Sequence, residues 1–209
     1  MVFRIVSHVA SLLTWLYLVQ LLHCCCHDKD DSWNCARSLT PEELPREGDL
    51  EGEWYEMGRT YFPYEYKQSC NVFNFSYIAT DDQGQKMHFL KMTAREENGQ
   101  EKITYLTILQ PNPPSGLLDF DFHHRSPTTF SKFQAYVIHF QRGEYMVLYA
   151  CQNEVKAYLQ AYVHKVKHAW ILSRTPNMNE DTLARLQKEL LSVGGIRNNQ
   201  LSRVEQKKC

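Results

Sequence analysis

Histidine and cysteine are the residue types in this chain that could bind a metal ion or haem or form disulfides. Neutral imidazole is a common ligand for metal ions and haem iron. The candidate histidines are His123, His124, His139, His164 and His168. Adjacent residues on a strand face opposite ways, so His123 and His124 cannot readily share one site, and no helical His-x-x-x-His pair supports a cluster. We therefore expect no metal and no cofactor, and keep a haem- or metal-binding protein as the alternative.

Four cysteines follow the N-terminal apolar segment: Cys35, Cys70, Cys151 and Cys209. An even number in an oxidising compartment indicates two disulfides, with three possible pairings. Cys35 and Cys209 lie in the two tails, whereas Cys70 and Cys151 lie in apolar, strand-like runs. If one disulfide joins each tail to the body of the domain, all four cysteines are paired. We favour the pairs Cys35–Cys151 and Cys70–Cys209. Zinc is the competing explanation, but no close Cys-x-x-Cys pair remains.

The first 26 residues have the pattern of a secretory signal peptide. Arg4 precedes an apolar run from Val9 to Leu22, which is shorter than the roughly 20 residues that span a bilayer. Cleavage after Cys26 would leave His27 as the mature start, and an uncleaved membrane anchor is the alternative. We expect residues 27–209 to form one secreted, extracellular domain. The net charge of −1 provides no electrostatic case for binding nucleic acid.

The elements that position these residues are predicted to be strands. From Gly52 to Pro176, runs rich in Tyr, Phe, Val, Ile and Thr alternate with turn clusters, and several runs alternate with a period of two. Short connections imply antiparallel neighbours, and eight such strands can close into an up-and-down barrel. The fold class is therefore all-β, with an eight-stranded antiparallel barrel over about 50–176. The expected strands cover about 52–61, 70–79, 85–95, 102–110, 117–123, 133–140, 145–155 and 157–174.

After Pro176 the pattern changes to that of an α-helix over about 179–193. Asn177 or Asn179 can cap its start, acidic residues occupy its first turn, and Gly194-Gly195 ends it. We expect its apolar stripe to pack against the outside of the barrel. The leucines of that stripe are Leu183, Leu186, Leu190 and Leu191.

Three separated blocks resemble the lipocalin family, and within it the apolipoprotein D and insect Lazarillo-like branch. The blocks are Gly52-Glu53-Trp54-Tyr55-Glu56-Met57, Tyr145-Met146-Val147-Leu148-Tyr149-Ala150-Cys151 and Ala169-Trp170-Ile171-Leu172-Ser173-Arg174-Thr175-Pro176. The resemblance implies that Gly52 turns the chain into the first strand and that Arg174 lies across Trp54, closing one end of the barrel. Cation–π attraction there would contribute roughly 0.5–2 kcal/mol. The cysteine positions also resemble that branch, whose pattern implies the pairing favoured above.

Two segments depart from the family pattern. Many members carry Thr-Asp-Tyr at the turn between the sixth and seventh strands, where this chain has Phe140-Gln141-Arg142. This puts the usual hydrogen-bond network of the closed end in doubt. The loop over 115–132 also matches the family pattern poorly, so the ligand specificity that this loop gives other family members is not carried over to this chain.

Because side chains alternate along a strand, one residue of known orientation shows which side chains of that strand face the barrel interior, and three strands have such a residue. Asn74-Phe75-Ser76 is an N-glycosylation sequon, and a glycan on Asn74 must point outward. If Cys151 is bonded to a tail, its side chain faces outward. If Arg174 reaches Trp54, its side chain faces inward. These deductions predict an apolar, aromatic interior; the resemblance favours a hollow one, and a solidly packed barrel is the alternative. The predicted ligand contacts are Phe73, Phe75, Tyr77, Met146, Leu148, Trp170 and Leu172.

The expected function is that of a secreted, monomeric carrier of a small hydrophobic ligand, such as a fatty acid, sterol, retinoid or bilin. Tyr61, Phe62 and Tyr64 are candidates to control access, although a turn stiffened by Pro63 explains them equally well. Some lipocalins are thiol isomerases, but a disulfide explains Cys70 better than a nucleophile does. We therefore expect no catalytic residue and no enzymatic activity. No receptor can be named from the sequence.

Overall fold

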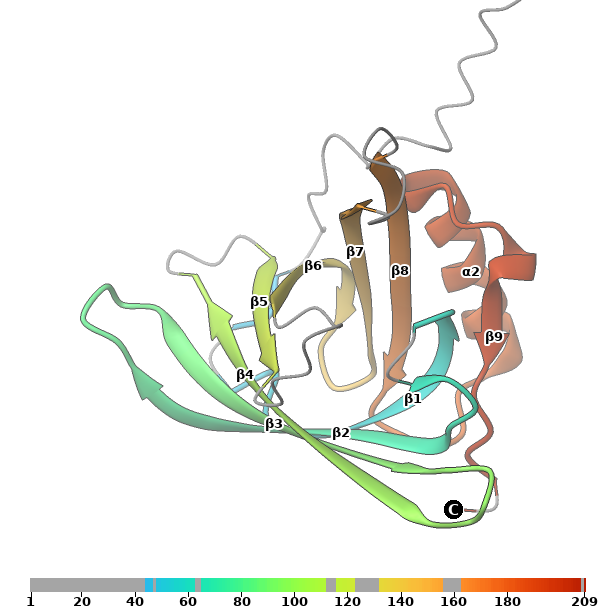
Figure 1. The fold of residues 1–209 in the computed structure, drawn as a ribbon, viewed down its shortest axis with the longest axis horizontal. Helices are drawn as coiled ribbons and strands as arrows, with labels where there is room; N and C mark the ends of the chain where they lie inside the picture. Colours follow the sequence, from blue (N-terminus) through green and yellow to red (C-terminus); the bar gives the residue numbers. More distant parts are fainter. Residues whose placement is uncertain are drawn as a thin grey trace, which may run out of the picture. The chain divides into compact units, whose positions relative to one another are not determined.

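The computed structural model describes residues 44–46, 48–62, 65–111, 116–122, 132–155, 163–207 and 209. Within these ranges the chain forms a single antiparallel sheet, one α-helix and one short 3-10 helix (Figure 1). The elements are β1 (Gly52–Thr60), β2 (Ser69–Thr80), β3 (Lys86–Arg95), β4 (Glu101–Gln110), β5 (Leu117–Phe122), β6 (Lys132–Gln141), β7 (Tyr145–Val155), β8 (Val163–Ser173), α2 (Glu180–Gly194), η3 (Asn198–Gln200) and β9 (Leu201–Arg203).

The sheet closes on itself because β1 pairs with both β8 and β2. Each strand from β2 to β8 is hydrogen-bonded to the next in antiparallel register, as short connections require. The predicted eight-stranded barrel with a helix outside it is therefore confirmed. The first seven strands begin and end within two residues of their predicted bounds. Residues 157–162, predicted to begin the eighth strand, lie outside the described part of the chain.

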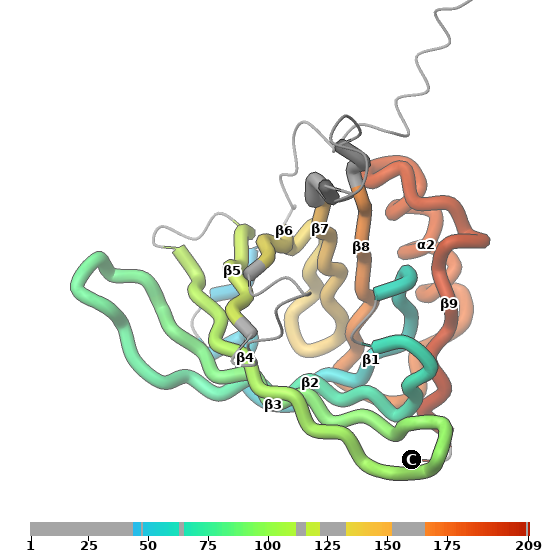
Figure 2. The backbone as a smooth tube through the Cα atoms, in the orientation of Figure 1, coloured from blue at the N-terminus to red at the C-terminus, as the bar shows by residue number. Residues whose placement is uncertain are grey.

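The ninth strand was not predicted. The edge of β1 that faces β2 pairs with β2 only over Gly52–Tyr55, and over Gly58–Thr60 it pairs with β9 instead. Figure 2 traces this C-terminal segment, in red, alongside β1. Backbone bonds continue the pairing, since the Val204 amide donates to the Met57 carbonyl at 3.1 Å. The tail thus extends the barrel wall where β2 leaves it.

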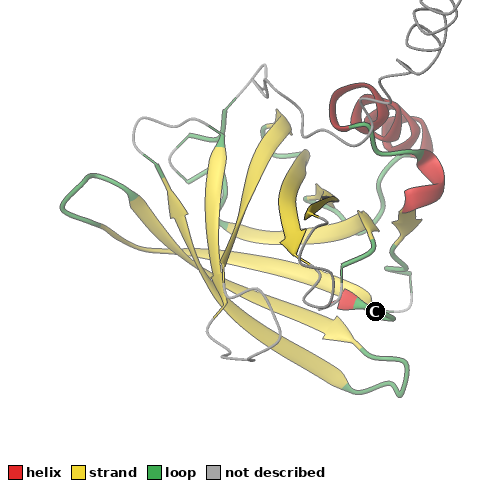
Figure 3. Cartoon of the chain, turned by 45° about the horizontal axis from the view of Figure 1, so that its top comes forward, coloured by secondary structure: helices red, strands yellow, loops and turns green. Residues whose placement is uncertain are grey.

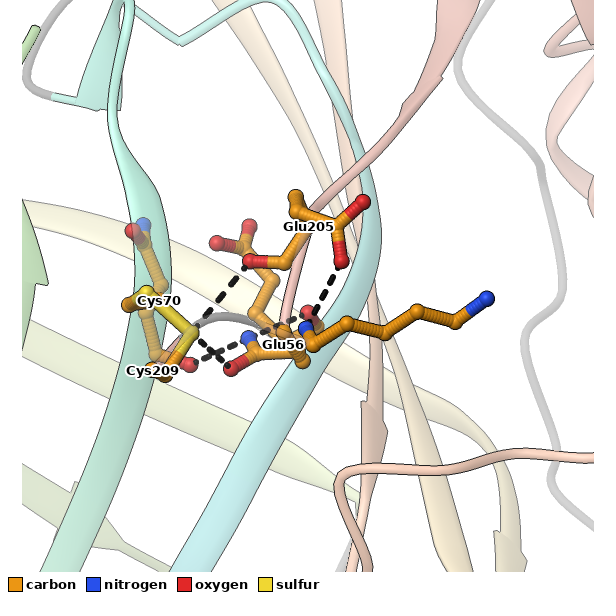
Figure 4. The surroundings of a disulfide bond; sticks show 7 residues. Glu56, Cys70, Glu205 and Cys209 are labelled. Carbon is orange, nitrogen blue, oxygen red and sulfur yellow. Dashed lines mark hydrogen bonds between the residues drawn. A yellow bond between two sulfur atoms is a disulfide. The ribbon is translucent and has the colours of Figure 1, made fainter.

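The Cys70–Cys209 disulfide ties this tail to the start of β2, as predicted (Figure 4). The Cys70 amide also donates to the Glu205 carbonyl at 3.0 Å. Because Cys70 is bonded, it is not available as a catalytic thiol. Cys151 is also disulfide-bonded. Its predicted partner Cys35 lies outside the described residues, so that pairing remains a prediction.

The helix α2 packs against the outer face of β7 and β8 (Figure 3). Asn179 caps it, with its side chain accepting from the Asp181 amide at 2.8 Å, and Gly195 ends it in the left-handed region with φ 62°. Leu183, Leu186 and Leu190 are buried there, as predicted. Leu191 does not belong to this stripe, because one residue further turns about 100° around the helix, and it is 45% exposed.

Two apolar layers stabilise the domain. One fills the barrel interior, and the other lies between the barrel wall and α2. Alternation along β7 divides its side chains between them. Met146 and Leu148 lie inside, as predicted, together with Ala150, whereas Tyr145, Val147 and Tyr149 face the helix.

Candidate functional site: the barrel interior

The closed end of the barrel is built on Trp54, which is 0% exposed. Its Nε1 donates to the Leu50 carbonyl at 2.8 Å, and the Arg174 Cζ lies 3.7 Å from its ring centroid. The guanidinium also donates to the carbonyls of Asp49 at 2.6 Å and Glu53 at 3.0 Å. The predicted indole–guanidinium contact is therefore confirmed.

Gly52 stands at this closed end with φ 86°, a conformation that L side chains rarely adopt. A Cβ at this position would lie 3.3 Å from Arg174 Nη1. Glycine therefore allows both the turn into β1 and the close approach of the arginine.

Residues 140–142 replace the usual family turn with a different network. Arg142 Nη2 donates to Asp49 Oδ2 at 3.0 Å, and the same Oδ2 accepts from the Arg46 amide at 2.7 Å. Phe140 is buried with its ring centroid 6.4 Å from that of Trp54. The departure in sequence thus preserves a closed end, with Asp49 at its centre.

Six of the seven predicted ligand contacts lie in the interior layer. Phe73, Phe75, Met146, Leu148, Trp170 and Leu172 are all at least 97% buried there. Tyr77 is the exception and corrects the prediction, since it is 47% exposed and packs edge-on against His88. The reason is that β2 extends beyond the barrel wall. Phe75 is already opposite Gly52, the first residue of β1, so Tyr77 has no β1 neighbour.

The described side chains nearly fill the interior. They leave a cavity of about 10 Å³, which is space for roughly one water molecule. Around this cavity, aromatic rings from several elements pack closely, so the interior that the described residues line is largely filled. The residues lining the cavity are Phe62, Glu65, Phe73, Met92, Leu106, Phe120, Phe133, Leu148 and Trp170.

Four apolar residues that line the cavity were missed by the sequence reasoning: Met92, Leu106, Phe120 and Phe133. They come from β3, β4, β5 and β6, one from each strand. Their strands do alternate, but no sequon, cysteine or closed-end contact indicates which alternate set faces inward. In the structure every second residue of β4 from Leu106 to Gln110 is buried, which places Leu106 in the inward set of that strand.

Phe62 fills the space at the centre of the cavity wall. It belongs to the loop after β1, and its ring centroid lies 5.2 Å from that of Trp170, 5.7 Å from Phe133 and 4.9 Å from His168. Its neighbour Tyr61 points away and is 65% exposed. Of the three predicted access residues, Phe62 therefore lines the cavity, whereas Tyr64 lies outside the described residues.

Glu65 is the one acidic residue among the described residues that line the cavity, and its role was not predicted. It is 1% exposed, and its Oε2 accepts from Trp170 Nε1 at 2.9 Å. Burial is the main cause that raises the pKa of its carboxyl from the ordinary 4.5 to about 7. The indole N–H and the charges of Arg59 and Lys102 oppose that rise.

A second buried carboxylate, Glu56, lies on the other side of Arg59. Arg59 Nη1 donates to Glu56 Oε2 at 2.7 Å, while Nη2 donates to the carbonyls of Glu65 at 2.6 Å and Gln68 at 2.8 Å. Arg59 Nε lies 4.0 Å from Glu65 Oε2. Burial, and then the neighbouring Glu65, hold the pKa of Glu56 well above its usual range.

His168 and His139 lie in separate places, and each contacts neighbouring protein groups. His168 is buried, and its Nδ1 donates to the Tyr61 carbonyl at 3.0 Å. His139 faces α2, with Nδ1 3.6 Å from Glu189 Oε2. Within the described ranges no three His, Cys, Asp or Glu residues are placed to hold a metal ion. His123 and His124 lie outside those ranges, and the side chain of His164 is not described.

The described part of the chain contains no helix that is both long and apolar enough to span a membrane.

Comparison with known proteins supports the assignment of the fold. Residues 49–206 match the family model of the lipocalin-like domain. No curated protein sequence matches the chain. Lobster apocrustacyanin A1 superposes with a TM-score of 0.61 at 14% identity, over 82% of this chain and 90% of that one. Insecticyanin from the tobacco hornworm Manduca sexta superposes with a TM-score of 0.62 at 14% identity, over 81% and 85%. The siderocalin Ex-FABP superposes with a TM-score of 0.53 at 12% identity, over 75% and 94%. The chain belongs to the lipocalin-like family.

Proposed function

We propose that the protein is a secreted carrier that binds one small hydrophobic ligand inside the barrel. The observation that carries this proposal is that one aromatic side chain of the cavity lining, Phe62, comes from a loop, and we propose that a ligand displaces its ring. Phe62 comes from a loop, whereas the apolar residues around it come from paired strands. A loop residue can move without breaking the hydrogen bonds that close the sheet, so the interior can open while the barrel stays intact.

In this proposal the loop opens, because the cavity lined by the described residues is far smaller than the roughly 300–1,000 Å³ typical of ligand sites. A ligand that takes the place of the Phe62 ring would bury its own apolar surface against Phe73, Phe133 and Trp170. Such burial contributes roughly 25 cal/mol per Å², less the cost of ordering ligand and loop. The ligand would therefore match or exceed a phenyl ring in apolar area.

Several features of the proposal come from the sequence. Residues 1–26 would be the signal peptide, and the mature chain would be a monomer carrying a glycan on Asn74. The confirmed Cys70–Cys209 bond supports placement in the apolipoprotein D and Lazarillo-like branch, where Cys35–Cys151 would be the second bridge. The siderocalin Ex-FABP, described as functioning through dual ligand specificities, supports ligand binding by this fold.

The test replaces the Phe62 ring. Phe62→Ala removes the side chain that a ligand must displace, so the variant should bind the neutral apolar probe N-phenyl-1-naphthylamine at least about tenfold more tightly than the natural chain. The matched control is Tyr61→Ala, which removes an adjacent exposed ring and should leave probe affinity unchanged. Fluorescence titration measures both.

The natural ligand is sought separately. Protein secreted from cultured cells would be analysed by native mass spectrometry, and the bound fraction extracted with organic solvent. Failure of both the natural chain and Phe62→Ala to bind the probe, together with an extract free of small apolar molecules, would refute the carrier proposal.

A further inference from the structure

The cavity wall carries an acidic group, Glu65, whose ion pair with Arg59 is long at 4.0 Å. Among the described lining residues, Glu65 is surrounded by apolar side chains, and the one polar neighbour, the Trp170 indole, already donates to Oε2 at 2.9 Å. Arg59 Nη1 and Nη2 are directed to the Glu56 carboxylate and to two backbone carbonyls. The Arg59 Nε at 4.0 Å is beyond hydrogen-bond distance of Glu65 Oε2.

The charges of this buried group do not balance. Glu56, Glu65 and Arg59 are each at least 92% buried, so two carboxylates share one guanidinium. The 2.7 Å contact assigns the guanidinium to Glu56. Lys102 acts on Glu65 from β4 as a weaker influence than Arg59. A buried carboxylate whose ion pair with the described cations is long remains costly in an apolar surrounding, so Glu65 favours either a bound proton or a closer cationic partner.

We infer that the ligand of this lipocalin carries a protonated amine on an apolar body, and that Glu65 receives the ammonium group inside the barrel. The inference rests on the proposed carrier function and names the class of ligand. An ammonium would supply the missing charge and donate a charge-assisted hydrogen bond to the carboxylate. A fatty acid would instead bring a second carboxylate to Glu65, and like charges at short distance repel strongly where the dielectric is low.

The loop geometry links the arrival of the ligand to this carboxylate. The Glu65 amide donates to the Phe62 carbonyl at 3.0 Å, so the Phe62 ring and the acid belong to one turn. A ligand that displaces the Phe62 ring therefore enters the space beside Glu65. The apolar body would then lie against the rings of Phe73, Phe133 and Trp170.

The experiment compares probes that share one tail and differ in the head group: decylammonium, decanol and decanoate. Their affinities are measured at pH 8 by displacement of N-phenyl-1-naphthylamine. We expect decylammonium to bind about tenfold more tightly than decanol, since hydrogen bonds to charged partners are roughly twice as strong as neutral ones. Decanoate should bind most weakly.

Two variants separate the local effect of Glu65 from the overall charge of the protein. Glu65→Gln keeps an acceptor for the Trp170 indole and should remove the preference for decylammonium over decanol. Glu97→Gln makes the same change in net charge at an exposed carboxylate that pairs with Lys67, and should keep the preference. The wild-type protein provides a readout that requires no variant. Protonation of Glu65 below pH 7 should weaken decylammonium binding several-fold at pH 5.5, whereas decanol binding should not change.

The outcomes distinguish the two proposals. Binding of no probe would refute the carrier function and this inference with it. Binding without preference for the amine, or a preference that survives in Glu65→Gln, would overturn the inference and leave the carrier function standing. A pH effect on the amine that persists in Glu65→Gln would belong to Glu56 or to His168, which packs against Phe62, and would equally overturn the assignment.

Discussion

Replacement of Glu65 by glutamine should change the pH dependence of folding in a direction that the buried carboxyl dictates. In the folded protein its pKa is raised from 4.5 to about 7, mainly by burial. Below pH 4.5 the group is protonated in both the folded and the unfolded chain, so its contribution to stability is fully present. As the pH rises to about 7, the unfolded chain loses the proton first, and the folded state is progressively destabilised. Above pH 7 this loss is complete and constant.

The magnitude follows from the size of the shift. A change from 4.5 to about 7 corresponds to roughly 3 kcal/mol as an upper limit. Glutamine stays neutral at every pH and keeps an oxygen for the Trp170 N–H, so Glu65→Gln avoids that loss. Glu56 adds to the difference, because the variant removes one of the two causes that raise its pKa. Glu65 alone should therefore raise the stability of the variant relative to wild type by up to roughly 3 kcal/mol between pH 4.5 and pH 8.

Urea unfolding, monitored by circular dichroism at half-unit intervals of pH, measures this difference. The control is Glu97→Gln, whose side chain is 63% exposed and whose relative stability should change by less than about 1 kcal/mol over the same interval. Parallel curves for wild type and Glu65→Gln would show that Glu65 does not titrate as a buried group. The charge argument for the cavity would then fail as well.

Three further predictions concern the barrel and its surface. Trp54→Ala should lower the free energy of unfolding by about 3–5 kcal/mol without changing probe selectivity. Trp170→Ala should be similarly destabilising but should also change probe selectivity, because it removes the N–H donor to the Glu65 carboxylate. Urea unfolding and the series of decyl probes measure the two effects. Gly194→Ala should cost roughly 1–3 kcal/mol despite the better helix propensity of alanine, since its Cβ would lie 2.7 Å from the buried Tyr149 ring, and a stabilised variant would contradict this packing. Asn74 should carry a glycan in secreted protein, seen as a mass loss on enzymatic deglycosylation that disappears in Asn74→Gln; identical masses before and after treatment would refute its use.

The elements of the barrel were predictable because their signals are local. Alternation with a period of two marks strands, and leucines at helical spacing after a capping asparagine mark the helix. The closed end was also predictable, because the sequence blocks that contain Gly52, Trp54 and Arg174 resemble the lipocalin family. The cysteine at each end of the Cys70–Cys209 bridge lies where one disulfide can join tail and body.

The properties that decide ligand binding depend on contacts between distant segments, which no local pattern contains. No local pattern marks Glu65 as a buried residue. Its burial depends on contacts with distant residues such as Trp170, which lies 105 residues away and donates a hydrogen bond to it. Phe62 is one of several aromatic residues in that loop, and only packing against Phe133 and Trp170 places it inside while Tyr61 stays exposed. The strand β9 contains only Leu201–Arg203, which is too short for an alternating pattern to predict its pairing with β1. Periodicity records which side of an element is apolar, whereas the volume left inside and the charges that meet there arise only when all the elements are assembled.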